Sequence, residues 1–378
     1  DIIQRNHIEP IEVTQIRENI KQSFRRLEFQ EGPHLYFLHN DDGTTLQLPS
    51  VSHVTHKYKP FFDAEAQSKK TAIKLGKTQE EVLRMWEEIN IKATNNGTST
   101  HLFGESFMYF FMNQPELIPD VIKPQYEKGY LIPYSTKQEA ILKFYEDLFV
   151  NDRIYPVMPE AQVYMGVNDN FLDVKQYAGT FDMLFTYKSN DGKWKLLLYD
   201  YKTNENLYND YARNFNKMFL SPFNELYDES FSAYILQLSC YSLCLQQLGY
   251  EVADRKLIWL KNDGTYEAIS TPDYSKQIRA ALQEETPRVR QTTIFFEEPT
   301  ITNRTSSKQL NTRLHSAKST KNDEFYTRFE EIDEEVIHYK EQFKDKIVLC
   351  NCNDTIQRNF YKYFSSNFHE YGIKKVIA

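Results

Sequence analysis

Two hydrophobic runs on either side of a short polar turn predict a β-hairpin near the middle of the chain. Two runs rich in aromatic and branched residues, GTFDMLFTY and KWKLLLYDYKT, are separated by SNDG. Asn-Asp-Gly between two such runs is a strong hairpin signal. A three-residue turn with Gly192 in the left-handed conformation pairs Ser189 with Lys193 and places Asp182 opposite Asp200. A two-residue loop would slip this register by one position.

Helical and strand patterns surround the hairpin. The pattern over residues 63–112 predicts a helix with Thr78 as its N-cap and Glu81 completing a capping box, then an interruption at Asn95 to Gly97 and a second helix from Thr98. Further helices are predicted over 11–29, 136–150 and 231–250, strands over 155–165, and a last hairpin over 256–269. The order of elements predicts an α/β fold with a mixed sheet.

The hairpin gathers groups that suit phosphodiester chemistry. Two facing carboxylates, Asp182 and Asp200, repel each other unless a cation or a proton lies between them. Carboxylate ligands favour Mg²⁺ or Mn²⁺. Lys202 lies on the same strand face as Asp200, where its ammonium could stabilise developing negative charge or orient a water. On the hairpin alone, a salt-bridged surface hairpin explains the same residues equally well.

Four other residues are candidates for the same site. His101 lies one helical turn before Glu105 and could ligate a metal that the glutamate helps to orient, although a packed histidine is the simpler interpretation. Glu160 could be a further acidic ligand or an exposed strand residue. Gln237 and Tyr241 lie one turn apart in an apolar helix, where they either brace the site or form a surface pair.

Composition narrows the class of protein. The chain has 378 residues and a net charge of −8, which excludes a uniformly basic nucleic-acid coat but allows a locally basic cleft. Its four cysteines lack zinc-like spacing and suggest reduced thiols. No apolar run is long enough for a membrane span, so we expect a cytoplasmic protein without a membrane partner. Because the sequence begins with Asp1, the natural N-terminus is expected to precede it.

Four motifs occur in the order that is typical of one nuclease superfamily: GTSTH, GTFDMLF, YDYKT and QLSCY. Glu160 lies between the first two. Over residues 48–270 the chain resembles the RecB-like branch of the PD-(D/E)xK nucleases, which implies a restriction-endonuclease-like core of helix, mixed sheet with catalytic hairpin, and helix. The resemblance implies Mg²⁺ or Mn²⁺ ligands at His101, Asp182, Asp200 and the backbone carbonyl of Tyr201, with Glu160 as an added candidate. It implies catalytic or supporting roles for Asp182, Asp200, Lys202, Gln237 and Tyr241. The cluster-binding cysteines of some members are absent.

Two activities fit this resemblance, and a third function competes with them. The first is a Mg²⁺-dependent DNA nuclease. If the C-terminal segment described below belongs to a methyltransferase, this nuclease could be part of a restriction–modification fusion. The runs LPSVSHVTHKYKPFF and VLRMWEE resemble the region before GTxxH in phage-type single-strand exonucleases, which suggests end processing for recombination or repair instead. A non-catalytic DNA-binding or assembly protein could keep the fold, although the intact charged residues argue against this.

The C-terminal segment resembles a second family. After a nuclease domain at 1–298 and a polar linker at 299–320, residues 321–378 look like the opening of an EcoRI-type adenine-specific DNA methyltransferase. The motif CNCNDT departs from that family at Asn353 and Thr355, and no downstream Asp/Asn-Pro-Pro-aromatic motif follows. The resemblance implies a partial Rossmann-like βαβ segment, which uses S-adenosylmethionine only if residues outside this chain complete it. Such a fragment is expected to dock on the nuclease domain, on missing methyltransferase residues or on another chain, with a homo-oligomer as one outcome.

Overall fold

A computed structural model describes most of the chain. It covers residues 9–30, 34–127 and 129–284, and in the C-terminal part Val336, 343–349, Tyr363, Phe364, Phe368 and 371–377. The predicted linker at 299–320 therefore lies outside the described residues, as do Asn353 and Thr355. Within the part that is described, every helix is too short or too polar to span a lipid bilayer.

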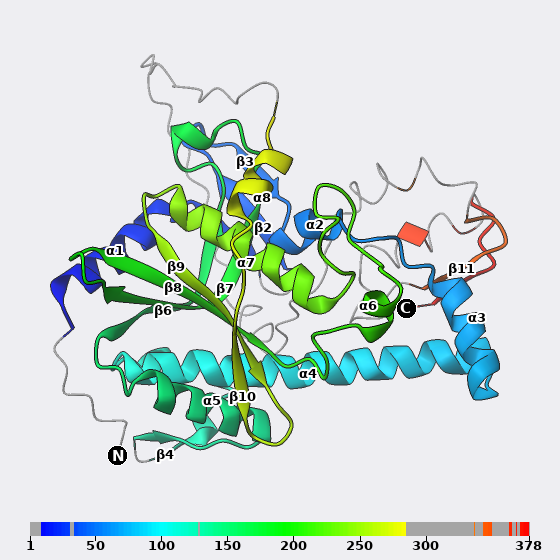
Figure 1. The fold of residues 1–378 in the computed structure, drawn as a ribbon, viewed down its shortest axis with the longest axis horizontal. Helices are drawn as coiled ribbons and strands as arrows, with labels where there is room; N and C mark the ends of the chain where they lie inside the picture. Colours follow the sequence, from blue (N-terminus) through cyan, green and yellow to red (C-terminus); the bar gives the residue numbers. More distant parts are fainter. Residues whose placement is uncertain are drawn as a thin grey trace, which may run out of the picture.

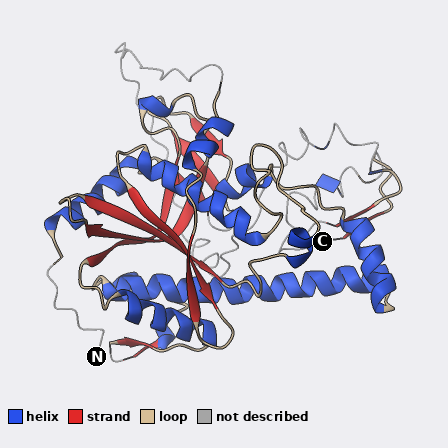
Figure 2. Cartoon of the chain, in the orientation of Figure 1, coloured by secondary structure: helices blue, strands red, loops and turns tan. Residues whose placement is uncertain are grey.

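A five-stranded sheet forms the centre of the molecule (Figures 1 and 2), with strand order β10-β9-β8-β7-β6. Its strands are β6 (Ile154–Tyr164), β7 (Ala178–Lys188), β8 (Trp194–Lys202), β9 (Val252–Leu260) and β10 (Tyr266–Ser270). The β8–β9 pair is parallel and the other neighbours are antiparallel. The prediction of an α/β fold with a mixed sheet is confirmed.

The remaining elements cover this sheet and its ends. A second, three-stranded sheet contains β1 (Leu27–Gln30), β2 (Leu35–His39) and β3 (Thr45–Leu48), and β4 (Tyr126–Glu127) pairs with β5 (Tyr130–Leu131). The α-helices in the N-terminal half are α1 (Ile11–Ser23), α2 (Val51–His56), α3 (Ala64–Leu75), α4 (Gln79–Phe111) and α5 (Thr136–Leu148). They are followed by α6 (Asp210–Asn214), α7 (Ser230–Gln246) and α8 (Ser275–Ala281).

The predicted hairpin register is confirmed over the β7–β8 ladder. Its pairs run from Lys188 opposite Trp194 to Met183 opposite Tyr199. The Ser189 N–H donates to the Lys193 carbonyl at 2.8 Å, which closes a three-residue turn. Gly192 has φ +79°, the left-handed conformation that such a turn requires and that glycine adopts without steric cost.

The sheet is buried on both faces. Leu196 and Leu198 of β8 belong to a hydrophobic core that includes α7, whereas Leu197, Tyr199 and Tyr201 belong to a second core with α4 and α5. In Figure 1, α7 lies on one side of the sheet and α4 with α5 on the other. Because alternate residues of a strand face opposite ways, this arrangement sends Asp200 and Lys202 toward α7 and Tyr201 toward α4.

The predicted helix break at Asn95 to Gly97 is wrong. Residues Gln79–Phe111 form one continuous helix, and the predicted capping box of Thr78 and Glu81 opens it. A glycine inside a helix costs about 1 kcal/mol relative to alanine. Tertiary packing outweighs that local cost, because α4 packs on α3 through its N-terminal half and on the sheet through buried residues such as Phe103.

In the C-terminal part, two short parallel strands are described: β11 (Ile347–Leu349) and β12 (Lys375–Ile377). Tyr363, Phe364, Tyr371 and Ile373 bury their side chains together beside them, while the predicted apolar position Phe360 lies outside the described residues. The strand β11 lies against α3, and Lys375 makes an ion pair with Glu80 at the start of α4. The described C-terminal residues therefore contact the α3–α4 corner.

Candidate active site

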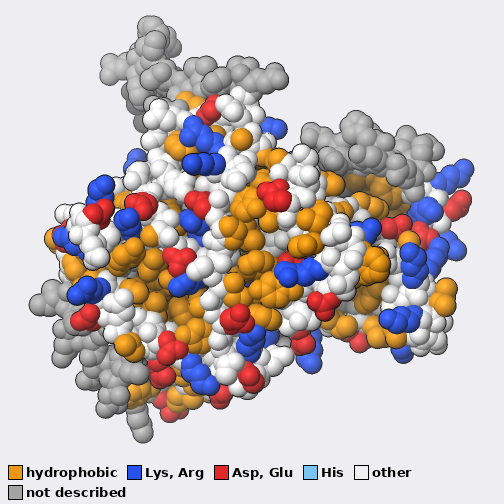
Figure 3. All heavy atoms as spheres, viewed as in Figure 1, with side chains coloured by type: hydrophobic (Ala, Val, Ile, Leu, Met, Phe, Trp, Pro, Cys, Tyr) orange, Lys and Arg blue, Asp and Glu red, His pale blue; other side chains and the backbone are white. Residues whose placement is uncertain are grey.

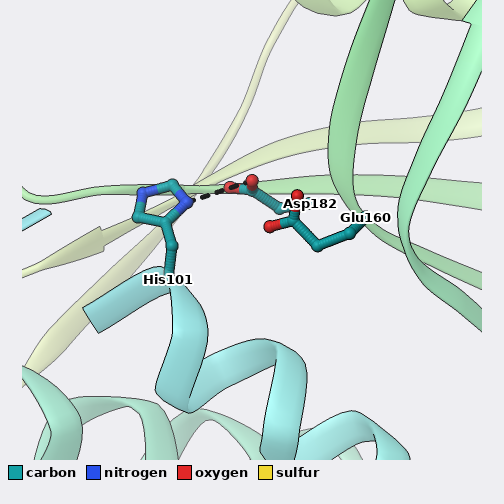
Figure 4. A group of neighbouring side chains, drawn as sticks. All are labelled: His101, Glu160 and Asp182. Carbon is teal, nitrogen blue, oxygen red and sulfur yellow. Dashed lines mark hydrogen bonds and ion pairs between the residues drawn. The ribbon is translucent and has the colours of Figure 1, made fainter. Parts of the chain in front are cut away.

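His101, Glu160 and Asp182 converge from three different elements (Figure 4). One potential ligand atom from each lies within 4.8 Å of the other two. The Nδ1 atom of His101, on α4, is 3.1 Å from Oδ1 of Asp182, on β7. The side chains of His101 and Asp182 are only 12% and 8% exposed. Among the described residues, this is the group of three whose geometry suits a metal ion, and Glu105 is not part of it.

The backbone at Glu160 deviates from ordinary strand geometry. Pairing of β6 with β7 links Pro159 to Met183 and Ala161 to Phe181, so Glu160 comes opposite Asp182. Its φ is +46°, a left-handed value that is uncommon for a residue other than glycine. Such conformations cost about 1–3 kcal/mol and concentrate at functional sites. Figure 4 shows the Glu160 carboxylate directed toward Asp182.

The second oxygen of Asp182 fixes the end of the hairpin. Oδ2 accepts a hydrogen bond from the backbone N–H of Tyr201 at 2.7 Å. The β7–β8 ladder stops at Met183 and Tyr199, one pair before the predicted pair of Asp182 and Asp200. If the ladder continued, the Tyr201 N–H would donate to a backbone carbonyl of β7. Because a buried N–H requires an acceptor, the Asp182 carboxylate accepts this hydrogen bond instead. The two aspartates are neighbours at a diverging strand end rather than a pair in the ladder.

Lys202 is held by Asp200 and by a chain of polar contacts on α7. Its Nζ atom is 2.5 Å from Oδ2 of Asp200 and donates to Oε1 of Gln237 at 3.4 Å. Gln237 in turn donates from Nε2 to the Tyr241 hydroxyl at 3.1 Å. The ring of Tyr234 lies beneath the ammonium, 4.1 Å from Nζ to the ring centroid, a cation–π distance. The four predicted residues Asp200, Lys202, Gln237 and Tyr241 are therefore brought together.

The electrostatics of the two aspartates differ. Burial, followed by the charge of Asp182, raises the pKa of Asp200 to about 7. Burial also acts to raise the pKa of Asp182, but the adjacent His101 and Lys202 and the Tyr201 N–H hold it below its ordinary value. Burial acts to lower the pKa of Lys202, yet the charge of Asp200 keeps it above its ordinary value. Neighbouring groups whose pKa values are shifted in opposite directions are typical of sites that perform acid–base or metal chemistry.

The donor set fits a divalent metal ion. Carboxylate oxygens suit Mg²⁺ or Mn²⁺, whereas an imidazole nitrogen is a ligand more typical of transition metals. Oδ2 of Asp200 is buried and lies 2.5 Å from Nζ of Lys202, so the cation beside this oxygen is the lysine ammonium. A buried carboxylate requires such a charged partner. The roles of Asp200 and of the Tyr201 carbonyl as ligands remain predictions.

Two glycines allow this close packing and were not predicted as site residues. A Cβ on Gly104 of α4 would lie 2.5 Å from the Tyr201 ring, and one on Gly179 of β7 would lie 2.6 Å from the Tyr241 ring. Gly179 opens the motif GTFDMLF that contains Asp182, and Gly104 follows His101 by three residues. Tyr234 was also missed, although it is one turn before Gln237, on the same face of the helix.

Comparison with known proteins concerns the C-terminal part. Residues 313–378 match the family described as adenine-specific methyltransferase EcoRI, starting inside the predicted linker. Over 68 residues the chain is 52% identical to the type II methyltransferase M.EcoRI of Escherichia coli, covering 18% of this chain and 21% of that protein. It is 56% identical over 65 residues to the type II methyltransferase M.MpnI of Mycoplasma pneumoniae, covering 17% and 20%. The chain spans about a fifth of the length of these curated relatives. The predicted EcoRI-type methyltransferase segment is confirmed.

Proposed function

We propose that residues 48–270 form a Mg²⁺- or Mn²⁺-dependent DNA nuclease with a restriction-endonuclease-like core. The observation that carries the proposal is the convergence of Asp182, Asp200 and Lys202 at the diverging end of β7 and β8. Two buried carboxylates of unlike pKa beside a paired lysine are costly as a structural feature, since burying a charge is unfavourable. A catalytic site accounts for that cost, whereas an exposed salt-bridged hairpin does not match the burial.

Each residue has a role in this proposal. His101, Glu160 and Asp182 hold the metal, with Asp200 and the Tyr201 carbonyl as further ligands. When bound, the ion polarises the scissile phosphate and neutralises charge on the leaving oxygen. Lys202 places its positive charge beside the attacking water, and Gln237 with Tyr241 fixes the ammonium in position. The Tyr201 N–H keeps the Asp182 carboxylate oriented.

We further propose that the nuclease belongs to a restriction–modification protein. The support is the methyltransferase-like segment at 313–378, which follows the nuclease part in the same chain. In this proposal the domains are a nuclease part at 1–298, a linker predicted at 299–320 that the family match shortens to end at 312, and a methyltransferase-like part from 313. DNA is the shared partner, the cytoplasm is the compartment, and S-adenosylmethionine is used only when the methyltransferase part is complete.

The test is cleavage of a panel of DNA substrates by the purified chain, with Mg²⁺, Mn²⁺ or EDTA. Unmodified closed circular plasmid should be cut in the presence of either metal if the protein acts in restriction. Degradation confined to linear DNA with free ends would favour the phage-type exonuclease instead. Binding of DNA without cleavage of any substrate under either metal would overturn the nuclease proposal and leave a non-catalytic DNA-binding protein.

A further inference from the structure

An exposed aromatic pair follows the strand that contains Lys202. Tyr211 and Phe215, on and just after α6 (Asp210–Asn214), are 62% and 63% exposed. Their ring centroids are 4.7 Å apart with an angle of 41° between the planes. Two large rings that contact each other and face solvent bury little apolar surface within the fold. Such a feature is typical of a binding surface.

Aromatic side chains also connect this region with Lys202. Trp259 on β9 pairs with Lys202 on β8, and its indole N–H donates to the Asn204 carbonyl at 2.7 Å. The Tyr208 ring meets the Trp259 ring edge-on at 6.3 Å. From the other side, the Tyr234 hydroxyl donates to Oδ1 of Asn204 at 2.9 Å while its ring lies beneath the Lys202 ammonium. Aromatic groups thus extend from the lysine to the loop before α6.

The loop that presents these rings is anchored. Arg213 donates two hydrogen bonds to Glu229, at 2.9 and 2.7 Å, and its guanidinium lies 4.6 Å from the Tyr208 ring centroid. The Asn209 side chain caps α6 by accepting from the Ala212 N–H at 3.2 Å. A preorganised platform binds more tightly than a mobile one, because less conformational entropy is lost on binding.

We propose that Tyr211 and Phe215 form a base-stacking surface for single-stranded DNA that leads to Lys202. This inference deepens the proposed nuclease function and rests on it. Every unpaired base presents a π-face, so stacking on aromatic rings tolerates any sequence, whereas bases inside a duplex are already stacked. The charge of the loop is mixed, since the Arg213 guanidinium is paired with Glu229. Stacking rather than phosphate attraction therefore carries the binding, and its salt dependence should be shallow.

The experiment measures binding without cleavage. Fluorescence anisotropy of labelled oligo-dT is followed in EDTA with the full chain and with Tyr211→Ala/Phe215→Ala. Loss of two stacking partners should weaken binding about tenfold or more, while affinity for a blunt duplex changes less than about twofold. The control is Tyr130→Ala, which removes a half-exposed ring from the β4–β5 hairpin, far from α6 in Figure 1. The variant Tyr211→Trp/Phe215→Trp should keep wild-type affinity.

The outcomes separate this inference from the proposed nuclease. Selective loss of oligo-dT binding in the alanine variant, without loss in the tryptophan variant, supports the stacking surface even if no DNA is cut. Unchanged oligo-dT binding overturns it, even if the wild-type chain cleaves DNA with Mg²⁺. An equal loss in the Tyr130→Ala control would also overturn it. A change in the oligomeric state of the alanine variant, measured by light scattering, without a change in oligo-dT affinity would overturn it as well, because the rings would then serve self-association.

Discussion

The Asp182 carboxylate accepts a hydrogen bond from the backbone N–H of Tyr201 at 2.7 Å, in the place where the hairpin ladder would otherwise continue. This contact gives the two aspartates different surroundings. Asp182 faces His101 and Glu160, whereas Asp200 faces Lys202 and α7. The two aspartates at this strand end therefore have unlike neighbours, while the charge of Asp182 still raises the pKa of Asp200.

The stability of the metal-free protein should fall as pH rises, because of Asp200. Its pKa is about 7 in the folded protein and 3.8 for an unperturbed aspartate. Between those values the folded state binds the proton more tightly, so deprotonation favours unfolding. Urea unfolding in EDTA should show a decrease of a few kcal/mol in the free energy of unfolding from about pH 4 to about pH 7. Asp200→Asn should remove most of this decrease; an identical decrease in the variant would contradict the environment assigned to Asp200.

Lys202→Met should retain metal binding and lose most of the cleavage rate. The ammonium is held by Asp200 and Gln237 and is assigned to the water or to charge in the transition state. Loss of one such electrostatic stabiliser typically lowers the rate by about 10²–10³. Calorimetry with Mn²⁺ checks the binding, and single-turnover cleavage checks the rate. Abolished Mn²⁺ binding in a folded variant would show that the lysine builds the metal site instead.

Two glycines of α4 provide a matched pair of substitutions. Gly104→Ala places a Cβ 2.5 Å from the Tyr201 ring, so the ring must move and the Tyr201 N–H is displaced from Asp182. Overpacking of this kind costs about 1–3 kcal/mol. In contrast, Gly97→Ala meets only Thr203 at an ordinary 3.5 Å and should stabilise the helix by up to about 1 kcal/mol.

Thermal unfolding and cleavage rates of both glycine variants test this account. We expect lower stability and impaired cleavage for Gly104→Ala, with cleavage retained for Gly97→Ala. Equal behaviour of the two variants would mean that close packing of Tyr201 on α4 does not organise the site.

Local patterns predicted the fold more completely than they predicted the site. The turn SNDG determined the hairpin register, and the capping residues Thr78 and Glu81 marked the start of α4. The false break at Asn95 to Gly97 came from local helix propensity. Propensity does not include the packing of the sheet and α3 on the helix. The left-handed Glu160 and the Asp182–Tyr201 bond depend on how strands diverge in three dimensions, which a pairing rule does not contain.

The C-terminal segment should be dispensable for cleavage. All the residues assigned to the site precede Glu298, and the described C-terminal residues contact the α3–α4 corner through β11 and Lys375. A chain ending at Glu298 should therefore keep metal-dependent nuclease activity. A 319–378 peptide should be unfolded by circular dichroism and should not bind S-adenosylmethionine, because it buries too little apolar surface. Loss of all cleavage in a folded 1–298 chain would show that the tail completes the nuclease.

The central claim is that Asp182 belongs to a metal site that hydrolyses DNA, and the most direct measurement compares wild type with Asp182→Asn. Both proteins are incubated with labelled DNA in Mg²⁺, Mn²⁺ and EDTA, after circular dichroism has shown equal folding. We predict cleavage by the wild-type chain in either metal, none in EDTA, and at least a 10²-fold lower rate for Asp182→Asn because a ligand to the ion is lost. Cleavage by Asp182→Asn at the wild-type rate, or wild-type cleavage that persists in EDTA, would contradict the claim.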